Sequence, residues 1–225
     1  MNALRTLAAA AIVCLCAAGR PVAADVIISP TAVLGNTGGN FGVGYEIGNT
    51  IDHSGLSTGF VSGVDDFDVY LAGSPSHTYV ASGFEWFTPL DVTSSTITYD
   101  LGAEYTLTRL ALWNEEFSGI EDMSVATSND PLFGTSTAVG AFSPTDSPFD
   151  TVYLAQVFAL TPTSARYVRL EVSGPNTPSR GNYVSMGEIA FATGAATVVP
   201  EPSALALLVG AGLASAGMLM RRRRT

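Results

Sequence analysis

Apolar and polar residues alternate in two short stretches of the chain, STITYDLG (95–102) and RYVRLEVSG (166–174). A period of two places successive side chains on opposite faces of a β-strand, so each stretch predicts a strand with one buried face. The apolar faces consist of Ile97, Tyr99 and Leu101 in the first strand and of Val168, Leu170 and Val172 in the second.

Further apolar runs predict strands at 107–113, 123–127, 152–160 and 184–192. Segments rich in Gly, Pro, Asn and Asp separate them, as is typical of turns. Between the two ends of the chain, no helical period persists over three turns. Many short strands with such punctuation predict an all-β fold, specifically an antiparallel jelly-roll β-sandwich.

The N-terminal segment 1–24 has the layout of a secretory signal peptide. A positive residue, Arg5, precedes an apolar run at 7–18, and small residues close the segment. Such segments are removed on export, and we expect cleavage between Ala24 and Asp25. The sequence therefore predicts an N-terminal signal helix and export of the remainder.

The C-terminal segment combines an uncharged run with a basic end. The 18 residues 203–220 carry no charge, and as a helix they would rise about 27 Å, enough to cross the hydrocarbon core of a bilayer. Four arginines follow at 221–224, and such residues stay on the cytoplasmic side of a membrane. The sequence predicts a C-terminal transmembrane helix that anchors the exported body.

The tail as a whole, 199–225, resembles the PEP-CTERM sorting signal of bacterial exported proteins, which is also catalogued as an ice-binding protein C-terminal domain. The resemblance implies recognition by an exosortase-type membrane protease, removal of the tail, and release to the cell surface or matrix. The body shows no regular Thr-x-Thr ladder, so the catalogue name does not imply ice binding. The sorting residues are Val199, Pro200, Glu201 and Pro202, with Arg221, Arg222, Arg223 and Arg224 after the helix.

The body between the ends, 25–197, is strongly acidic. It holds 19 Asp and Glu residues against four Arg and no Lys, which gives a net charge near −15. Nucleic acid and anionic membrane surfaces are disfavoured as partners, because both need a cationic footprint. The acidic run VDDFD (64–68) lacks the glycine and distal glutamate of an EF-hand loop and predicts a solvated turn. Both cysteines, Cys14 and Cys16, lie in the signal segment, so the body can form no disulfide.

The order of the predicted strands resembles the discoidin family, also called the coagulation factor 5/8 C-terminal or galactose-binding-like fold. The resemblance covers 47–192, with 25–46 as a glycine-rich edge segment and 193–198 as a linker to the tail. The family implies an eight-stranded jelly roll whose loops at one end bind ligands, often sugars. The motifs that carry the resemblance are Asp100-Leu101-Gly102, ARYVRL (165–170) and Gly187-Glu188-Ile189.

The same resemblance implies a structural calcium ion, held by an early loop and by the glutamate of the last core strand. Carboxylate, hydroxyl and carbonyl oxygens are the ligands that this hard cation prefers. Serines stand here where the family often has stronger ligands, and a plain turn with a surface glutamate remains the alternative. The expected ligands are the side chains of Asp52, Ser54, Ser57 and Glu188 and the backbone carbonyls of Asn49 and Gly187.

A sugar site needs an aromatic face surrounded by polar groups. Ring side chains in predicted loops are therefore the candidate contacts, although a core position is equally consistent with the tryptophan among them. Trp113, within a predicted strand, is expected in the core. The candidate ligand contacts are Trp86, Tyr79, His77 and Tyr183.

No catalytic residue is predicted. GLSTG (55–59) matches the nucleophile-elbow pattern around Ser57, but that motif needs a strand before it and a helix after it. The main prediction is an exported, non-catalytic binding module at the cell surface or in the exopolysaccharide matrix, with carbohydrate as its ligand. The alternatives are a structural matrix protein without a specific ligand and, more remotely, a hydrolase.

Overall fold

Two long strands organise the fold. The computed structural model describes residues 24–175 and 180–194, in which β5 (Ser94–Trp113) and β9 (Gln156–Ser173) pair antiparallel along nearly their whole lengths. The alternating stretches found in the sequence lie within these two strands, and their apolar residues are buried. The antiparallel β-sandwich predicted from the pattern is confirmed.

Five shorter strands complete the main sheet, whose order is β1-β11-β5-β9-β6-β7, with β2 pairing β5 beside this path. All of their pairings are antiparallel. The bounds are Val26–Ile28 for β1, Ala32–Asn36 for β2, Asp122–Ser128 for β6, Thr137–Phe142 for β7 and Glu188–Thr193 for β11.

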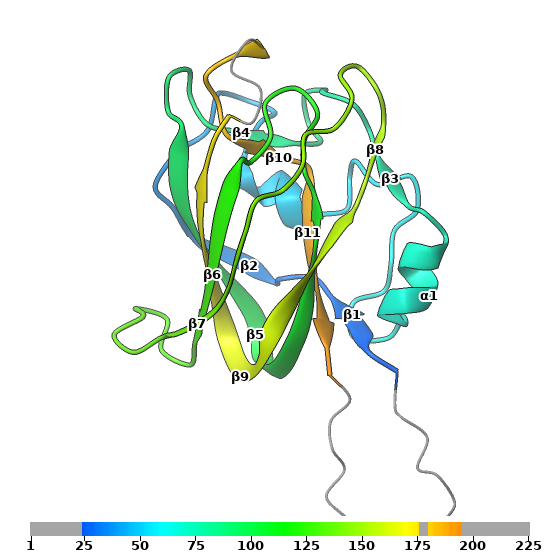
Figure 1. The fold of residues 1–225 in the computed structure, drawn as a ribbon, viewed down its shortest axis with the longest axis vertical. Helices are drawn as coiled ribbons and strands as arrows, with labels where there is room; N and C mark the ends of the chain where they lie inside the picture. The colour runs from blue at the N-terminus through cyan, green and yellow to red at the C-terminus, as the bar shows by residue number, and fades with distance from the viewer. Residues whose placement is uncertain (1–23, 176–179, 195–225) are drawn as a thin grey trace, which may run out of the picture.

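The long strands belong to both layers of the sandwich (Figure 1). The first part of β5 pairs with β2 and its last part with β11, and the register of β5 against β9 shifts between Asp100 and Tyr105. At this bend Gly102 has φ +82, and a Cβ there would lie 2.9 Å from the Thr31 methyl group. Because glycine alone adopts this conformation without steric cost, the bend depends on Gly102.

The core fills the space between the layers. One layer contains β2, β6 and β7, and the other contains β1 and β11. The core combines residues from the first layer, such as Ile97 and Leu170, with residues from the second, such as Leu112 and Phe191, all of them 0% exposed. Val125 of β6 packs into the same cluster. Burial of aliphatic and aromatic side chains on this scale is the main force that stabilises the sandwich.

A second apolar cluster lies on the outer side of the layer that contains β11, and α1 (Phe67–Ala72) covers it. Trp113 belongs to it and is fully buried, which confirms the prediction that it is a core residue. The acidic run 64–68 proves not to be a simple turn. Asp66 accepts a hydrogen bond from the Val69 N–H and caps α1, so the last residues of the acidic run form the first turn of a short helix.

The remaining elements are short and frame the ends of the sandwich. The loops after β5, β7 and β9 meet at the end where β4 pairs with β10, here called the loop end, while the described chain ends leave from the opposite end (Figure 1). Their bounds are Ile47–Ile51 for the 3-10 helix η1, Ser76–His77 for β3, Trp86–Phe87 for β4, Tyr153–Leu154 for β8 and Ser185–Met186 for β10.

Residues 25–46, expected to form an edge segment, supply two edge strands, β1 and β2, of the sandwich itself. The signal segment 1–24 falls outside the described residues except for its last position, and the tail 199–225 falls outside them entirely. Among the residues that the structure describes, no helix is long and apolar enough to cross a membrane.

A pair of leucines tests the core. Leu170→Ala removes a fully buried side chain between the layers and is expected to lower the free energy of unfolding by about 2–5 kcal/mol. Leu132→Ala changes a side chain that is 84% exposed and should shift it by less than about 0.5 kcal/mol. Urea denaturation measures both, and equal effects would contradict the assigned core.

Candidate ligand-binding site

A small apolar pocket lies at the loop end, with a volume of about 130 Å³. Its walls come from segments far apart in the sequence, so it exists only in the folded chain. Five of its six lining side chains are aromatic, the composition expected of a site for a ligand with an apolar face. The lining residues are Phe41, Tyr45, Val80, Phe87, Phe117 and Tyr183.

The rings of this pocket pack edge to face. The centroid of Tyr183 lies 5.5 Å from that of Phe41 and 5.9 Å from that of Phe87, each at an interplanar angle of 80°. Tyr45 contacts Phe87 in the same way at 5.4 Å. Such contacts hold the rings in place, which makes the pocket largely preformed. Phe41 is 51% exposed, so one wall faces solvent.

Buried glutamates fix the loops that carry these rings. Glu115 is fully buried, and its Oε2 accepts hydrogen bonds from the backbone N–H groups of Phe117 (2.7 Å) and Ser118 (2.9 Å). The same oxygen accepts a hydrogen bond from the Ser185 hydroxyl at 2.9 Å. The position of the Phe117 ring therefore depends on a carboxylate beneath it.

Glu116 connects two other loops. Its Oε1 accepts from the Val80 N–H (2.9 Å) and its Oε2 from the Asp150 N–H (3.2 Å), and it too is fully buried. Glu85 acts within one loop, where its Oε2 accepts from the Ala81 N–H at 2.8 Å. Three glutamate carboxyl groups thus replace regular secondary structure as hydrogen-bond partners for the loop backbone.

Burial makes two of these acids weak. The pKa of Glu85 rises to about 9 and that of Glu115 to about 8, in both cases chiefly because burial disfavours the charged form. The neighbouring carboxylates raise both pKa values further. Oε1 of each side chain is buried without a hydrogen-bond partner among the described residues. At neutral pH these groups hold protons.

His77 lies against this cluster. Burial lowers its pKa to about 4, and its Nδ1 is 3.0 Å from the Tyr153 hydroxyl and 3.6 Å from Glu85 Oε1. The last distance would suit an ion pair. However, burial raises the pKa of the acid and lowers that of the base, so we describe the contact as one between neutral groups.

Two of the residues expected to bind calcium, Asp52 and Glu188, lie near one another. Asp52 follows η1, Glu188 begins β11, and Glu188 Oε2 accepts a hydrogen bond from the His53 N–H at 3.0 Å. Asp52 Oδ1 accepts from the Ser54 N–H at 2.9 Å. The pKa of Glu188 lies well above its usual range, first through burial and also through the negative charge of Asp52. The predicted loop and the predicted glutamate are thus neighbours.

The oxygen atoms of the expected ligands can be compared with those that a hard cation prefers. Glu188 Oε1 is buried and has no hydrogen-bond partner among the described residues, and the negative charge of Asp52 acts on this carboxyl group. Ser57 Oγ accepts from the Ser76 N–H, and Ser54 Oγ donates to the Gly83 carbonyl. Both hydroxyls keep a lone pair, so the residues fit a hard cation. Within 24–175 and 180–194, no group of three His, Cys, Asp or Glu side chains is arranged to hold a metal.

The predicted sugar contacts are distributed differently from what was expected. Tyr183 lines the pocket, and Tyr79 is 49% exposed but is not among the lining residues. Trp86 and His77 are both 0% exposed, so the prediction that they face a ligand is wrong. Trp86 packs in the core, where its Nε1 donates to the Gly39 carbonyl at 2.9 Å.

Sequence reasoning missed most of the pocket. Phe41 and Tyr45 lie in the glycine-rich stretch GNFGVGYE (39–46), which was assigned to an edge segment. Phe117 follows Glu115 and Glu116, and none of these three residues was a candidate from the sequence. No local sequence pattern marked these rings, because the pocket forms only where distant loops meet.

The nucleophile-elbow motif does not have the structure it requires. Ser57 lies in an irregular loop, and no helix of the described chain follows it directly. Its hydroxyl accepts from the Ser76 N–H at 3.0 Å. His77, the nearby histidine, is fully buried and bonded elsewhere. This geometry does not support a hydrolase built on Ser57.

Comparisons with known proteins found no matching family model and no match among curated proteins. Solved structures do match. The chain is similar to the C-terminal domain of a chitobiase from Bacteroides fragilis, with 15% identity, a TM-score of 0.49, and coverage of 73% of this chain and 95% of the other.

Two further similar structures are binding modules. A chitosan-binding module of a chitosanase/glucanase from Paenibacillus sp. IK-5 has 20% identity and a TM-score of 0.48, over 73% of this chain and 95% of that one. A family 32 carbohydrate-binding module from C. perfringens, in complex with galactose, has 12% identity and a TM-score of 0.49, over 75% and 98%. These TM-scores lie below 0.5, so the similarity to these structures does not assign a function to the chain.

The weak buried acids predict a pH dependence of stability. The pKa of Glu85 is raised from 4.5 to about 9, so the folded state binds more protons than the unfolded chain between these values. Stability should therefore fall as the pH rises through this window. In Glu85→Gln this contribution disappears, and the variant should gain on the order of 4 kcal/mol relative to the parent between pH 5 and pH 8.

Urea denaturation at pH 5, 6.5 and 8 measures the difference. Glu121→Gln, which changes an exposed acid, is the control and should keep the parent's pH slope. A parent and a Glu85→Gln variant with parallel slopes would contradict the assigned protonation.

Proposed function

We propose that the protein is an exported, non-catalytic carbohydrate-binding module of the discoidin type, which binds a sugar at the aromatic pocket of the loop end. The observation that carries the proposal is the preformed pocket, in which five rings from distant segments pack together and buried glutamates bond the backbone of Phe117 and Val80. A purely structural matrix protein would have no need of such a pocket, because its loops could be polar and irregular.

The pocket is suited to one apolar face of a pyranose ring. The half-exposed ring of Phe41 and the neighbouring Tyr183 would contact the C–H groups of the sugar, which pack well on aromatic faces. Among the described residues, no hydrogen bond engages the hydroxyl of Tyr45 or Tyr183, so both remain available to sugar hydroxyls. Binding of this kind involves no covalent chemistry.

A calcium ion at Asp52 and Glu188 would support the pocket from below. When bound, it supplies the positive charge that two neighbouring carboxylates need. Asn49 connects the two regions, since its side-chain amide donates to the carbonyls of Gly44 (3.0 Å) and Glu85 (2.9 Å). We include the backbone carbonyls of Asn49 and Gly187 and the side chains of Ser54 and Ser57 in the proposed ligand set.

Delivery is also part of the proposal. The signal segment 1–24 and the tail 199–225 would direct the module to the cell surface or the matrix, with an exosortase-type protease acting on the tail. This step rests on the sequence of the two ends.

The pocket is tested by removing one ring. Tyr183→Ala opens the wall that contacts both Phe41 and Phe87 and is expected to weaken glycan binding at least tenfold. The measurement is calorimetric titration of the full-length chain with neutral oligosaccharides from a panel that includes the host's own polysaccharide.

Tyr167→Ala is the matched control, because this tyrosine lies on β9 at the opposite end of the sandwich. It should leave binding unchanged. A folded parent that binds no member of the panel would refute the carbohydrate proposal and favour the structural alternative.

Calcium is tested through stability. With an affinity of about 10⁻⁴ to 10⁻³ M, 10 mM calcium should raise Tm by roughly 3 to 10 °C over the chelated protein. Glu188→Gln should lose this response because it removes one of the two carboxylates. Glu104→Gln, an exposed acid elsewhere, should retain it. An identical Tm for the parent with calcium and with chelator would exclude the site.

A further inference from the structure

The rings at the loop end continue beyond the aromatic pocket. Phe117, which lines the pocket, has its ring centroid 6.4 Å from that of Tyr183 and 5.7 Å from that of Phe149. Phe149 belongs to the loop between β7 and β8 and is not among the lining residues of the pocket. Together with one further ring of the pocket, these residues form a continuous series of ring contacts, which we call the ring row: Phe41, Tyr183, Phe117 and Phe149.

Both ends of the ring row face solvent. Phe41 is 51% exposed and Phe149 is 50% exposed, whereas the two rings between them are partly buried. Within the described residues, no ring contact joins Phe41 to Phe117 or to Phe149, so the row is open-ended rather than closed on itself. Half-exposed aromatic side chains that adjoin a pocket form a surface that a ligand can cover. The ring row therefore extends the aromatic surface past the pocket.

A glycine leaves room for the contact in the middle of the ring row. Gly181 has φ +148, and a Cβ at this position would lie 2.3 Å from the Tyr183 ring and 3.5 Å from the Phe117 ring. A side chain here would displace the Tyr183 ring, whereas glycine also adopts this backbone conformation without steric cost. The contact between Tyr183 and Phe117 thus depends on a residue that has no side chain.

A buried glutamate fixes the far end of the ring row. Glu116 Oε2 accepts a hydrogen bond from the N–H of Asp150, the residue after Phe149, and the Glu116 carbonyl accepts one from Arg180 Nη1. The guanidinium of Arg180 in turn lies over the Phe149 ring, 5.0 Å from its centroid. Phe149 is therefore held beside Phe117 both through its neighbouring backbone and through its ring.

Arg180 brings polar groups to this end of the row without a net charge. Its Nη1 lies 3.6 Å from Asp146 Oδ2, and the two side chains are 26% and 31% exposed. The pair presents N–H donors and carboxylate acceptors near a half-exposed ring, and carbohydrate recognition uses this combination of groups. Because the pair is neutral and the body has a net charge near −15, an uncharged glycan is favoured over an acidic one.

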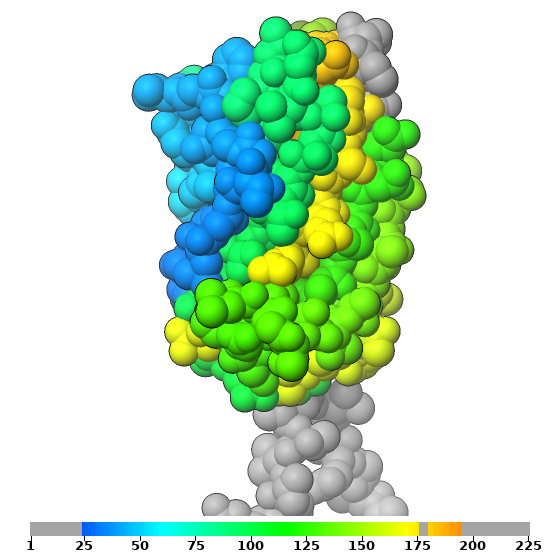
Figure 2. Space-filling view, turned by 90° about the vertical axis from the view of Figure 1, so that its left-hand side faces the viewer, coloured from blue at the N-terminus to red at the C-terminus, as the bar shows by residue number. Residues whose placement is uncertain are grey.

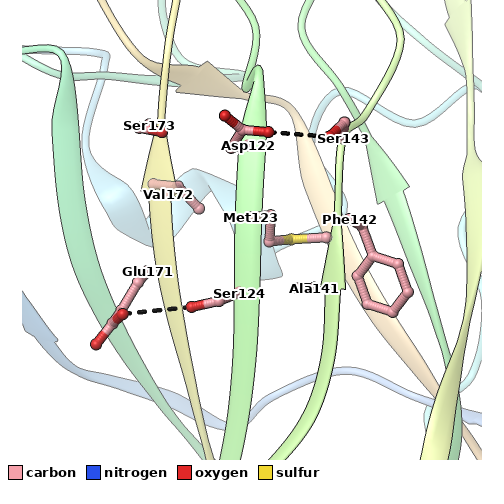
Figure 3. A pocket seen from close by; sticks show the side chains of 9 residues that line it. All are labelled: Asp122, Met123, Ser124, Ala141, Phe142, Ser143, Glu171, Val172 and Ser173. Carbon is pink, nitrogen blue, oxygen red and sulfur yellow. Dashed lines mark hydrogen bonds between the residues drawn. The ribbon is translucent and has the colours of Figure 1, made fainter.

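A larger hollow, of about 530 Å³, lies on the flank of the sandwich over β6, β7 and β9 and has a different character (Figure 3). Its one aromatic lining residue, Phe142, packs on Phe158 with the ring centroids 4.9 Å apart. At the loop end, in contrast, segments from the early part of the chain (blue), the middle (blue-green) and the last strands (orange) meet (Figure 2). The ring row therefore has no counterpart among the lining residues of the flank hollow.

We propose that Phe149 and Arg180 form a second sugar subsite next to the aromatic pocket, so that the ligand is a segment of an uncharged polysaccharide with at least two sugars. One sugar would occupy the pocket, and its neighbour along the polysaccharide would pack on the Phe149 ring. The continuity of the row selects this occupant, because Phe117 belongs to the pocket and also contacts Phe149. The inference rests on the proposed carbohydrate function and adds to it the length of the recognised segment.

The experiment titrates the full-length chain by calorimetry with neutral oligosaccharides of graded length, from a single sugar to a hexamer, prepared from glucan, galactan, mannan and the host's own polysaccharide. In the series that the parent binds, affinity should rise at least about tenfold from one sugar to three, because a second ring contact is added. Phe149→Ala should remove most of this gain and leave the affinity for the single sugar unchanged. Phe149→Tyr, which keeps a ring, should retain the gain.

Two variants serve as references. Val152→Ala changes a 58% exposed side chain of the same loop that lies outside the ring row, and it should bind every length like the parent. Tyr183→Ala changes the pocket itself and should weaken binding of the single sugar and of the longer ligands alike. Thermal denaturation of all variants verifies that each remains folded at the temperature of the titrations.

The possible outcomes separate this inference from the proposed function. If the parent binds one sugar as tightly as six, or if Phe149→Ala keeps the full gain with length, the second subsite is overturned while the pocket stands. If the folded parent binds no sugar of any length, both proposals fail. A gain with length that Phe149→Ala loses and Val152→Ala keeps supports the second subsite.

Discussion

The pairing of β5 with β9 is the interaction on which the rest of the structure depends. Each of these strands runs through both layers, so the backbone of each strand connects the layers covalently. The hydrogen bonds between the two strands continue from one layer into the other. Every other main strand except β1 and β7 pairs directly with one of these two. The bend of β5 at Gly102 lets this strand pass from one layer to the other, and the ends of the two strands bring Trp113 and Ser173 to the loop end.

Above that scaffold, the loops are organised by acids rather than by strands. Glu85, Glu115 and Glu116 are buried where the backbone has no ladder to join, and each accepts N–H groups that would otherwise lack a partner. The arrangement costs stability as the pH rises, because burial opposes ionisation. In return it orders the backbone of loops that do not belong to the main sheet.

The sequence predicted the scaffold well and the binding surface poorly, for physical reasons. A period of two at Ile97 and Val168 directly reports a buried strand face, and the structure confirms it. The neighbourhood of Asp52 and Glu188 was also anticipated, through resemblance to a family. A pocket made by Phe41 and Phe117, in contrast, depends on how distant loops fold over buried carboxylates. No local pattern encodes that, just as none distinguished the buried Trp86 from an exposed one.

The two ends of the described chain leave the sandwich together. Val26 of β1 pairs with Thr193 of β11, so both exits lie side by side at the pole opposite the aromatic pocket. A tether joined to either exit would leave the aromatic pocket at the end of the domain that is farthest from the point of attachment. Attachment through the N-terminal exit and attachment through the C-terminal exit would therefore present the pocket in the same orientation.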